Sequence, residues 1–371
     1  MRRFLTGSDG WPYLLLPAIP AAVALELLGA GPVAVFLVSA LGVVPTAALM
    51  GRATEELAAR SGPGIGGLLN VTFGNAPEII IALFALNAGL HEVVKASLVG
   101  SILGNILLVL GAAMLVGGIG RERQFFDRTA ASAQSLMLML AVAALAMPAI
   151  FELVEGQGLP RPGQEIVNYD STVEHLSLAV AIVLLITYAG GLLFSLKTHR
   201  ALFNPAHSDE AGDDEDGSPW SFRKAVLALA VAGVAVGVMS EILVGSITEA
   251  SETIGLSEFF VGVIVVAVVG NAAEHWVAVL AAHKDKMDLA VNIAIGSSAQ
   301  IALFAAPVLV IASFFIGPFP LAFVLNGFEI GAIVLAILIA NHVTQEGESH
   351  WFEGLQLLAI YIVLALGFYF A

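Results

Sequence analysis

Two short motifs, each combining an asparagine with a glutamate, carry the chemistry that this sequence offers. Residues 74–78 read GNAPE inside one apolar stretch, and residues 270–274 read GNAAE inside another. A carboxylate at the centre of a membrane-length apolar stretch is costly unless it has a partner, so it is a functional candidate by default. The asparagine and the glutamate of each motif are separated by one helical turn, which predicts that they share one helix face. The sequence therefore predicts two buried carboxylates, Glu78 and Glu274.

Small polar residues follow each motif at a fixed distance. Ser101 follows Glu78 at the same separation at which Ser297 follows Glu274. Asn105 and Gln300 are predicted to share helix faces with these two serines. Two motifs repeated in register indicate an internal duplication.

These residue types form a set of oxygen donors. Carboxylate, amide, hydroxyl and carbonyl oxygens suit a hard cation such as Ca²⁺, which takes about 6–8 oxygens in flexible geometry. Glycine lets a helix or an ion approach the backbone closely, and Pro77 has no N–H, which is expected to free the carbonyl of Phe73. The candidate metal ligands are Gly74, Asn75, Glu78, Ser101, Asn105, Gly270, Asn271, Glu274, Ser297 and Gln300. Hydrogen bonding between helices is the alternative role for the amides and hydroxyls.

Protons are the natural competitors for such a site. Two carboxyl groups buried side by side favour their protonated forms in the absence of a cation, because of desolvation and mutual repulsion. A bound cation would displace these protons, and a site occupied by one or the other is what an antiporter requires. We therefore expect proton exchange at Glu78 and Glu274, with Ca²⁺ as transported substrate and no cofactor.

The composition places the motifs in a membrane protein. Of 371 residues, 58% are hydrophobic and only 12% are charged, whereas a soluble domain has about 25% charged residues. The 30 acids outnumber the 15 lysines and arginines, and the absence of a basic patch argues against nucleic acid as a partner. With no cysteine in the chain, thiol catalysis, disulfides and Cys-ligated metals are excluded.

About eleven stretches are long and apolar enough to cross a bilayer, which takes about 20 residues each. They are 11–29, 32–50, 64–88, 93–119, 130–150, 173–196, 222–245, 257–283, 288–315, 320–341 and 352–371. If the N-terminus is cytoplasmic, every lysine and arginine except Lys95 and Arg161 lies on the cytoplasmic side, as the positive-inside rule requires. The acidic linker is then cytoplasmic as well, and the C-terminus lies outside.

This topology predicts an all-α, polytopic membrane protein. Its parts are a leading transmembrane helix (1–31), a first five-helix repeat (32–197), an acidic cytoplasmic linker (198–221) and a second five-helix repeat (222–371). The two motif-bearing spans run in opposite directions, so the repeats are inverted. Inverted repeats that meet at the bilayer midplane are typical of secondary transporters.

Several acids outside the motifs are candidates for gating or regulation. Glu55 and Glu249 begin short amphipathic segments, which either form gates or cap helix ends. The linker carries an acidic run that is either a Ca²⁺ sensor or a solvated linker, and it lacks EF-hand spacing. The candidate regulatory residues of that run are Asp213, Asp214, Glu215 and Asp216.

The motifs and their surroundings resemble a known family. GNAPEIIIALFAL and GSILGN in the first half, with GNAAEHWVAV, KDKMDLA and IGSSAQIALF in the second, are similar to the Ca²⁺/H⁺ antiporter (CAX) group of the calcium/cation exchanger superfamily. The similarity covers roughly 45–371 and includes FEI around Glu329 and WFEG at 351–354. The resemblance implies that Glu78 and Glu274 bind the cation and exchange protons. It also implies an acidic stretch between the halves, matched here by 209–216.

The expected function is therefore transport and not enzymatic catalysis. We expect a secondary active antiporter that exports Ca²⁺ from the cytoplasm in exchange for H⁺, by alternating access at a midplane carboxylate site. Its partners are then Ca²⁺, H⁺ and the lipid bilayer, with the oligomeric state left open. The alternatives are an exchanger coupled to Na⁺ or carrying K⁺ or Mn²⁺, a channel, and an intramembrane metal-dependent hydrolase. Against the hydrolase, the sequence has no histidine ligands at helical spacing beside the carboxylates and no nucleophile.

Overall fold

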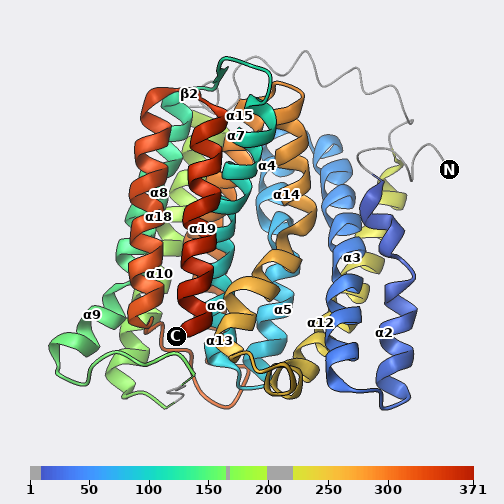
Figure 1. The fold of residues 1–371 in the computed structure, drawn as a ribbon, viewed down its shortest axis with the longest axis vertical. Helices are drawn as coiled ribbons and strands as arrows, with labels where there is room; N and C mark the ends of the chain where they lie inside the picture. The colour runs from blue at the N-terminus through green and yellow to red at the C-terminus, as the bar shows by residue number, and fades with distance from the viewer. Residues whose placement is uncertain (1–9, 164–167, 199–219) are drawn as a thin grey trace.

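The computed structural model describes residues 10–163, 168–198 and 220–371 of the chain. Most of these residues belong to helices that stand side by side and alternate in direction (Figure 1). The strands in the described part of the chain are β1 (Gln124–Phe125) and β2 (Glu348–Ser349), which pair antiparallel at one end of the molecule. The predicted all-α membrane fold is confirmed.

The helices of the first half include one short 3-10 turn, η1, and two π-helical stretches, η2 and η3. They are η1 (Trp11–Leu15), α2 (Ala18–Leu27), α3 (Pro32–Arg60), α4 (Gly62–Gly74), α5 (Ala76–Asn87), α6 (His91–Leu103), η2 (Gly104–Val109), α7 (Leu110–Gly118), α8 (Arg128–Leu145), α9 (Met147–Val154), α10 (Ser171–Leu193) and η3 (Phe194–Thr198). Side-chain caps set several of the starts. Asp127, for example, accepts the backbone N–H groups of Thr129 and Ala130 at the start of α8, satisfying donors that have no partner within the helix.

The second half contains three π-helical stretches, η4 to η6. Its helices are α12 (Phe222–Ile254), α13 (Glu258–Phe260), η4 (Val261–Val266), α14 (Ala267–His283), α15 (Met287–Val291), η5 (Asn292–Gly296), α16 (Ser297–Gln300), η6 (Ile301–Ala305), α17 (Ala306–Ser313), α18 (Gly327–Glu346) and α19 (Trp351–Phe370). π-Helical turns inside α-helices often mark functional positions. Here η5 immediately precedes Ser297 of the predicted site.

Every predicted span has a helical counterpart. Among the described residues, nine helices are long and apolar enough to cross a membrane, and a pair bent by 43° makes up to ten. The shorter apolar helix Trp11–Leu27 matches the first predicted span. How many of these helices cross the bilayer, and where the repeats begin and end, stay predictions.

Predicted boundaries differ from the structure in two ways. The span expected at 320–341 becomes helical only at Gly327, because Asn326 and Glu329 form a capping box there. Residues 321–326 are buried but not helical, and side-chain oxygens accept some of their N–H groups, such as Oγ of Ser313 for Leu321 at 2.7 Å. Buried irregular backbone of this kind is tolerated inside protein.

The second difference concerns α3 and α12, which continue well past the predicted spans. They end at Arg60 and Ile254, respectively. Glu55 and Glu249 are therefore exposed residues in the last turns of continuous helices. The expected separate amphipathic segments are not found, because neither helix has a break before these residues.

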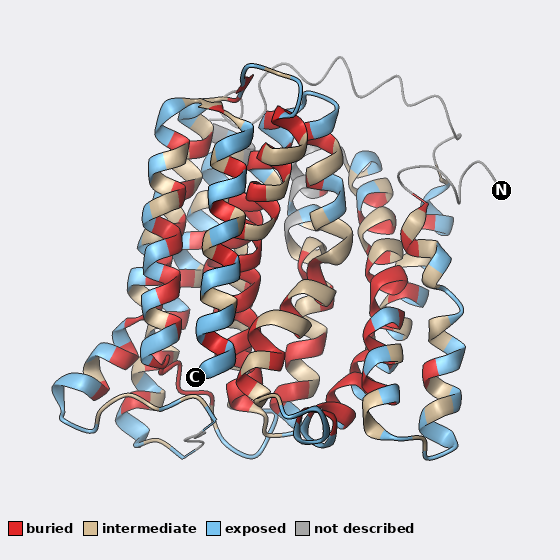
Figure 2. Cartoon of the chain, in the orientation of Figure 1, coloured by how far each residue is buried: buried red, intermediate tan, exposed pale blue. Residues whose placement is uncertain are grey.

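The core lies around two central helical rods. In the most apolar part of His91–Gly118, 78% of residues are buried, and in Met287–Ser313 the share is 72%, against 17% in Trp351–Phe370. Figure 2 shows the exposed outward faces of the peripheral helices, including α18 and α19. The helix pair α4–α5 runs in the opposite direction to α14 (Figure 1), and α5 contacts α14. The two motif-bearing helices are thus antiparallel neighbours.

Candidate cation site

The first motif lies at a break between two helices. Helix α4 ends at Gly74 and α5 begins at Ala76, with Asn75 in a non-helical conformation between them. Pro77 suits the first turn of a helix, where its missing N–H would have no partner within the helix. Asn75 is thus the N-cap of α5, and its carbonyl accepts the N–H of Ile79 at 3.1 Å, while a face shared with Glu78 stays a prediction. Pro77 has no N–H to donate to the carbonyl of Phe73, so a free carbonyl there stays a prediction.

The second motif lies within an unbroken helix. Ala273 takes the place of the proline, so α14 continues through the motif. The side-chain amide of Asn271 donates to the carbonyl of Ala267 in the preceding turn and to the hydroxyl of Ser101 on α6, both at 2.9 Å. The bond to Ser101 ties the second motif to the helix that follows the first motif.

Each glutamate lies against the glycine of the other motif. A Cβ atom placed on Gly270 would lie 3.4 Å from Cγ of Glu78, and one placed on Gly74 would lie 3.9 Å from Oε1 of Glu274. The arrangement is reciprocal, and it brings the two carboxylate side chains to the contact between α5 and α14. Glycine at these positions leaves room for them.

Helix α16 provides hydrogen-bond partners for both motifs. The hydroxyl of Ser297 donates to Oε2 of Glu274 at 3.0 Å. The side-chain amide of Asn75 donates to Oε1 of Gln300 at 2.8 Å. Ser101, Ser297 and Gln300, predicted from the helices that follow the motifs, therefore contact the motifs directly.

Three buried oxygens at this site have no hydrogen-bond partner among the described residues. They are Oε2 of Glu78, Oδ1 of Asn75 and Oδ1 of Asn271. Both asparagines donate through nitrogen and leave their oxygens unpaired, which is unfavourable for buried acceptors. A hard cation would satisfy such oxygens. In the described part of the chain no group of three or more His, Cys, Asp or Glu could hold a metal ion, so a cation here needs the amide oxygens as well as the two carboxylates.

Asn105 lies apart from this oxygen set. Its Oδ1 contacts Nε2 of His275 at 3.2 Å, and it belongs to the π-helical stretch η2. His275 is one helical turn after Asn271, so both project towards α6 and η2. That spacing was the signal in the sequence that could have paired Asn105 with His275.

A second amide pair was not anticipated. The side-chain amide of Gln134 on α8 donates to Oδ1 of Asn292 on η5 at 2.5 Å. A Cβ atom on Gly296 would lie 3.3 Å from that Oδ1 and 3.6 Å from Oε1 of Gln134. This pair therefore lies beside the residue that precedes Ser297. No repeated motif includes Gln134, so no pattern in the chain singled it out.

The proposed gating residues have different positions. Glu55 lies near the end of α3, which packs against α14, whereas Glu249 lies in the last turns of α12. The four linker acids at 213–216 lie outside the described residues.

Comparison with known proteins shows the family of this chain. The chain matches the sodium/calcium exchanger protein family over residues 31–197 and 224–370. A Ca²⁺/H⁺ antiporter of Aphanothece halophytica is 44% identical over 369 residues, covering 96% of this chain and 95% of that protein. A Ca²⁺/H⁺ antiporter of Bacillus subtilis is 42% identical over 358 residues, covering 96% and 97% of the two chains.

Solved structures give the same result. The structure of native YfkE matches with a TM-score of 0.81 and 38% identity, covering 97% of this chain and all of that one. An H⁺/Ca²⁺ exchanger, CAX, shares the fold with a TM-score of 0.72 at 16% identity, covering 98% of this chain and 89% of that one. The resemblance to the antiporter group is confirmed, and the chain belongs to the sodium/calcium exchanger protein family.

Proposed function

We propose that this protein is a secondary antiporter that exports Ca²⁺ from the cytoplasm in exchange for H⁺. Two relatives that align over almost their whole length are named Ca²⁺/H⁺ antiporters. The observation that carries the proposal is the reciprocal packing of Glu78 and Glu274 beside three unpaired buried oxygens. Two carboxylates balance the charge of a divalent cation, and the amide oxygens extend its coordination.

The proposed ligands are Glu78, Glu274 and the Oδ1 atoms of Asn75 and Asn271. Gln300, Ser101 and Ser297 hold these side chains by hydrogen bonds. Gly74 and Gly270 give the carboxylates room, and Asn105 supports the site through His275. This proposal divides the predicted residues into oxygens that contact the ion and residues that orient them.

Protons complete the proposed cycle. When the cation leaves, the two carboxylates are desolvated and close together, so protonation relieves their repulsion. The site then returns in its protonated form. A lower pH on the side of cation binding therefore weakens apparent Ca²⁺ affinity.

The proposed transport step is alternating access. The antiparallel motif helices and the break at Asn75 supply elements that can rearrange around a fixed site. In the proposed orientation, the loops containing Arg121 and Lys284 face the cytoplasm, and the C-terminus lies outside. The two segments that match the family, 31–197 and 224–370, support the proposed division into two repeats.

Transport into liposomes tests this function. Purified protein would be reconstituted, and Ca²⁺ flux would be measured under an imposed pH gradient and, separately, under a Na⁺ gradient. We expect the pH gradient to drive flux and Glu78→Gln or Glu274→Gln to abolish it, while Glu252→Gln, at an exposed position near the end of α12, retains it. Flux driven by Na⁺ alone would contradict the proposal, as would full exchange by either carboxylate variant.

The name of the family gives the Na⁺-coupled alternative a specific basis. The two gradients separate it directly from proton coupling. Adding K⁺ or Mn²⁺ as competitors to the same assay tests cation selectivity. We expect Ca²⁺ flux to persist in excess K⁺, because a monovalent ion leaves one of the two carboxylates unbalanced.

A further inference from the structure

Helix α5, which carries Glu78, ends in a hydrogen-bonded turn of a well-known type. The N–H of Gly89 donates to the carbonyl of Leu86 at 3.0 Å, and the N–H of Leu90 donates to that of Ala85 at 2.9 Å. This pair of bonds is a Schellman motif, which requires a left-handed residue after the helix. Gly89 supplies it with φ of 80°.

Helix α14, which carries Glu274, ends in the same turn at the same distance from its glutamate. The N–H of Asp285 donates to the carbonyl of Ala282 at 3.0 Å, and that of Lys286 donates to Ala281 at 2.9 Å. The left-handed residue here is Asp285, with φ of 63°, and among the described residues it is the only one other than glycine with positive φ. A side chain in this conformation is unfavourable, so its presence at a turn that glycine could form points to a role for the side chain.

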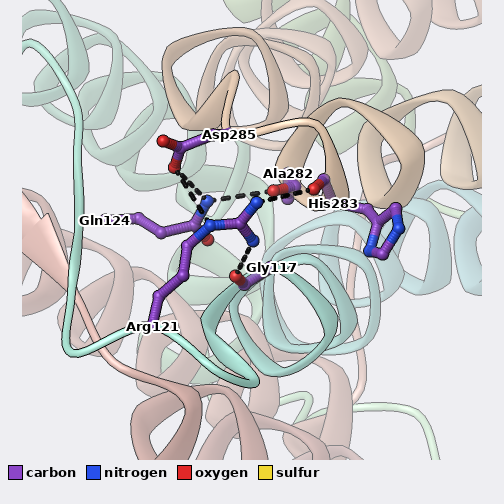
Figure 3. Close-up of polar contacts among 6 residues, drawn as sticks. All are labelled: Gly117, Arg121, Gln124, Ala282, His283 and Asp285. Atoms are coloured by element: carbon purple, nitrogen blue, oxygen red, sulfur yellow. Dashed lines mark hydrogen bonds and ion pairs between the residues drawn. The ribbon is translucent and has the colours of Figure 1, made fainter.

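The carboxylate of Asp285 contacts two residues of the segment between α7 and α8 (Figure 3). Its Oδ1 accepts a hydrogen bond from Nε2 of Gln124 at 2.9 Å and lies 3.7 Å from Nε of Arg121. Gln124 is 1% exposed, whereas the Arg121 ion pair is open to solvent and weak by itself. The bond from Gln124 is therefore the principal contact of this carboxylate.

Arg121 and Gln124 also bind the ends of two helices. Nη2 of Arg121 donates to the carbonyl of His283 at 3.0 Å, and Nη1 donates to that of Gly117 at 2.5 Å. Gln124 donates to the carbonyl of Ala282 at 2.9 Å. One guanidinium thus joins the C-terminal ends of α7 and α14, where unpaired carbonyls and the helix dipoles concentrate negative charge. We call Arg121, Gln124 and Asp285 the clasp.

The opposite end of the molecule has a glycine at the position that corresponds to Arg121. Gly317 follows Arg121 at the same offset at which Gly270 follows Gly74. A Cβ atom placed on Gly317 would lie 2.5 Å from the carbonyl of Leu86, so its backbone packs directly on the end of α5. At the clasp end it is Gly117 that allows close packing, since a Cβ there would collide with the side chain of Gln124 and the carbonyl of Ala282.

The clasp fixes the turn between two parts of the proposed ion site. Glu274 precedes His283 on the same helix, and the clasped turn leads into the rod that carries Ser297. Ser297 and Glu274 are joined by a hydrogen bond. Nearer the site, Asn271 attaches α14 to α6 through Ser101. A second attachment at the end of α14 would prevent the helix from tilting about that first one.

We infer that the clasp positions Glu274 for ion binding without contacting the ion. The inference rests on the proposed function of that site. Arg121, Gln124 and Asp285 are accordingly positioning residues, and their loss changes the affinity for Ca²⁺ more than the maximal rate.

Exchange kinetics in liposomes provide the first test. We expect Arg121→Ala and Gln124→Leu to raise the Ca²⁺ concentration for half-maximal exchange about tenfold, because a loosely held site loses ligand geometry. Asp285→Gly removes one bond but keeps the turn, so we expect about a threefold increase. Arg121→Lys retains a positive charge and should recover part of the affinity. The matched control is Arg123→Ala, in the same segment as Arg121 and Gln124. It removes a 3.0 Å ion pair with Glu348 on β2 and should leave the Ca²⁺ concentration for half-maximal exchange unchanged.

A distance measurement provides a second test that needs no transport. The chain has no cysteine, so a Val277→Cys, Leu355→Cys pair can be spin-labelled selectively at exposed positions of α14 and α19. We expect Arg121→Ala and Gln124→Leu to broaden the distance distribution measured by pulsed electron paramagnetic resonance. Arg123→Ala should leave it unchanged.

The outcomes separate this inference from the proposed function. If the wild type exchanges no Ca²⁺ for H⁺, the proposed function fails, while broadened distances still support a clasp that holds α14. If Arg121→Ala keeps wild-type half-saturation and a narrow distance distribution, the positioning role is overturned. A fall in maximal rate alone, in proportion to the amount of folded protein, also overturns it. Should Arg121→Ala not fold, Asp285→Gly decides by the same two measurements, since glycine suits the turn.

Discussion

The two helices that carry the carboxylates have similar motifs but are held in place by different contacts. The first is broken at Asn75, and its far end packs against the backbone at Gly317. The second is continuous, and Arg121 and Gln124 hold its end. The two motifs differ at Pro77 and Ala273, and proline removes a helical hydrogen bond that alanine keeps. One half of the site is thus bent within the motif, and the other is anchored beyond it.

The helices that follow the motifs also differ, in what packs against their glycines. A Cβ atom on Gly100 would collide with the backbone of Val263, whereas one on Gly296 would meet the side-chain amides of Asn292 and Gln134. The glycine of the first half therefore lies at a closed helix contact. That of the second half faces polar side chains that can move aside.

The largest expected difference between the two halves comes from adding a methyl group at each of these two glycines. Gly100→Ala should destabilise the folded protein by more than about 3 kcal/mol, because backbone atoms cannot yield to the added methyl group. Gly296→Ala should cost less than about 1 kcal/mol, because it meets side chains. Thermal unfolding of the purified variants in detergent measures both. Equal stability of the two variants would contradict the difference in packing.

The next largest difference comes from exchanging proline and alanine between the two motifs. Ala273→Pro should cost about 3 kcal/mol, since proline in a helix interior removes a hydrogen bond and clashes with the preceding turn. Pro77→Ala should change stability by less than about 1 kcal/mol, because the helix already begins there. Unfolding temperatures and Ca²⁺ flux would be compared for the two variants. A more harmful Pro77→Ala would show that the break itself stabilises the fold.

A smaller effect concerns the two serines that support the site. Ser297→Ala removes a hydrogen bond to a carboxylate, and Ser101→Ala removes one to a neutral amide. Bonds to charged groups contribute about 1.5–3 kcal/mol and neutral ones about 1 kcal/mol. We therefore expect a rise of about tenfold or more in half-saturating Ca²⁺ for Ser297→Ala and about fivefold for Ser101→Ala. If liposome titrations showed the larger rise for Ser101→Ala, the hydrogen bond from the first half would be the more important one for Ca²⁺ binding.

The smallest effect compares the two left-handed turns. Gly89→Ala should cost about 1 kcal/mol, because φ is positive there and Pro318 is 3.2 Å from the added Cβ. Asp285→Gly should change the unfolding temperature little, since relief of backbone strain offsets the lost bond to Gln124. A large loss of stability in Asp285→Gly would mean that the clasp serves mainly to hold the fold together.

Sequence predicted much of this molecule because local features encode it. The low charged fraction and the apolar stretches were sufficient for the membrane fold, and the repeated GNA-x-E motifs singled out Glu78 and Glu274 as candidate ligands. The bonds of Ser297 to Glu274 and of Gln300 to Asn75 join residues that the spacing had already selected. The break at Asn75 was missed, although Pro77 signalled it, because an apolar pattern continues across it.

Other contacts had no local signal. Gln134 and Asn292 are 158 residues apart, as are Gln124 and Ala282. The two side-chain amides of the first pair meet because α8 packs on η5, and Gln124, in the segment after α7, reaches the backbone carbonyl of Ala282 because α7 packs on α14. Such pairs depend on which helices become neighbours.

The sequence by itself determined the class of protein, the two carboxylates and the residue types around them, since hydropathy and spacing are properties of the chain. Only the tertiary structure decided which oxygens stay unpaired, which helix is bent and which is clasped. The physical reason is that hydrogen-bond satisfaction and close packing are properties of neighbouring helices. Asp285 illustrates this, because its left-handed turn against Gln124 exists only in the folded protein.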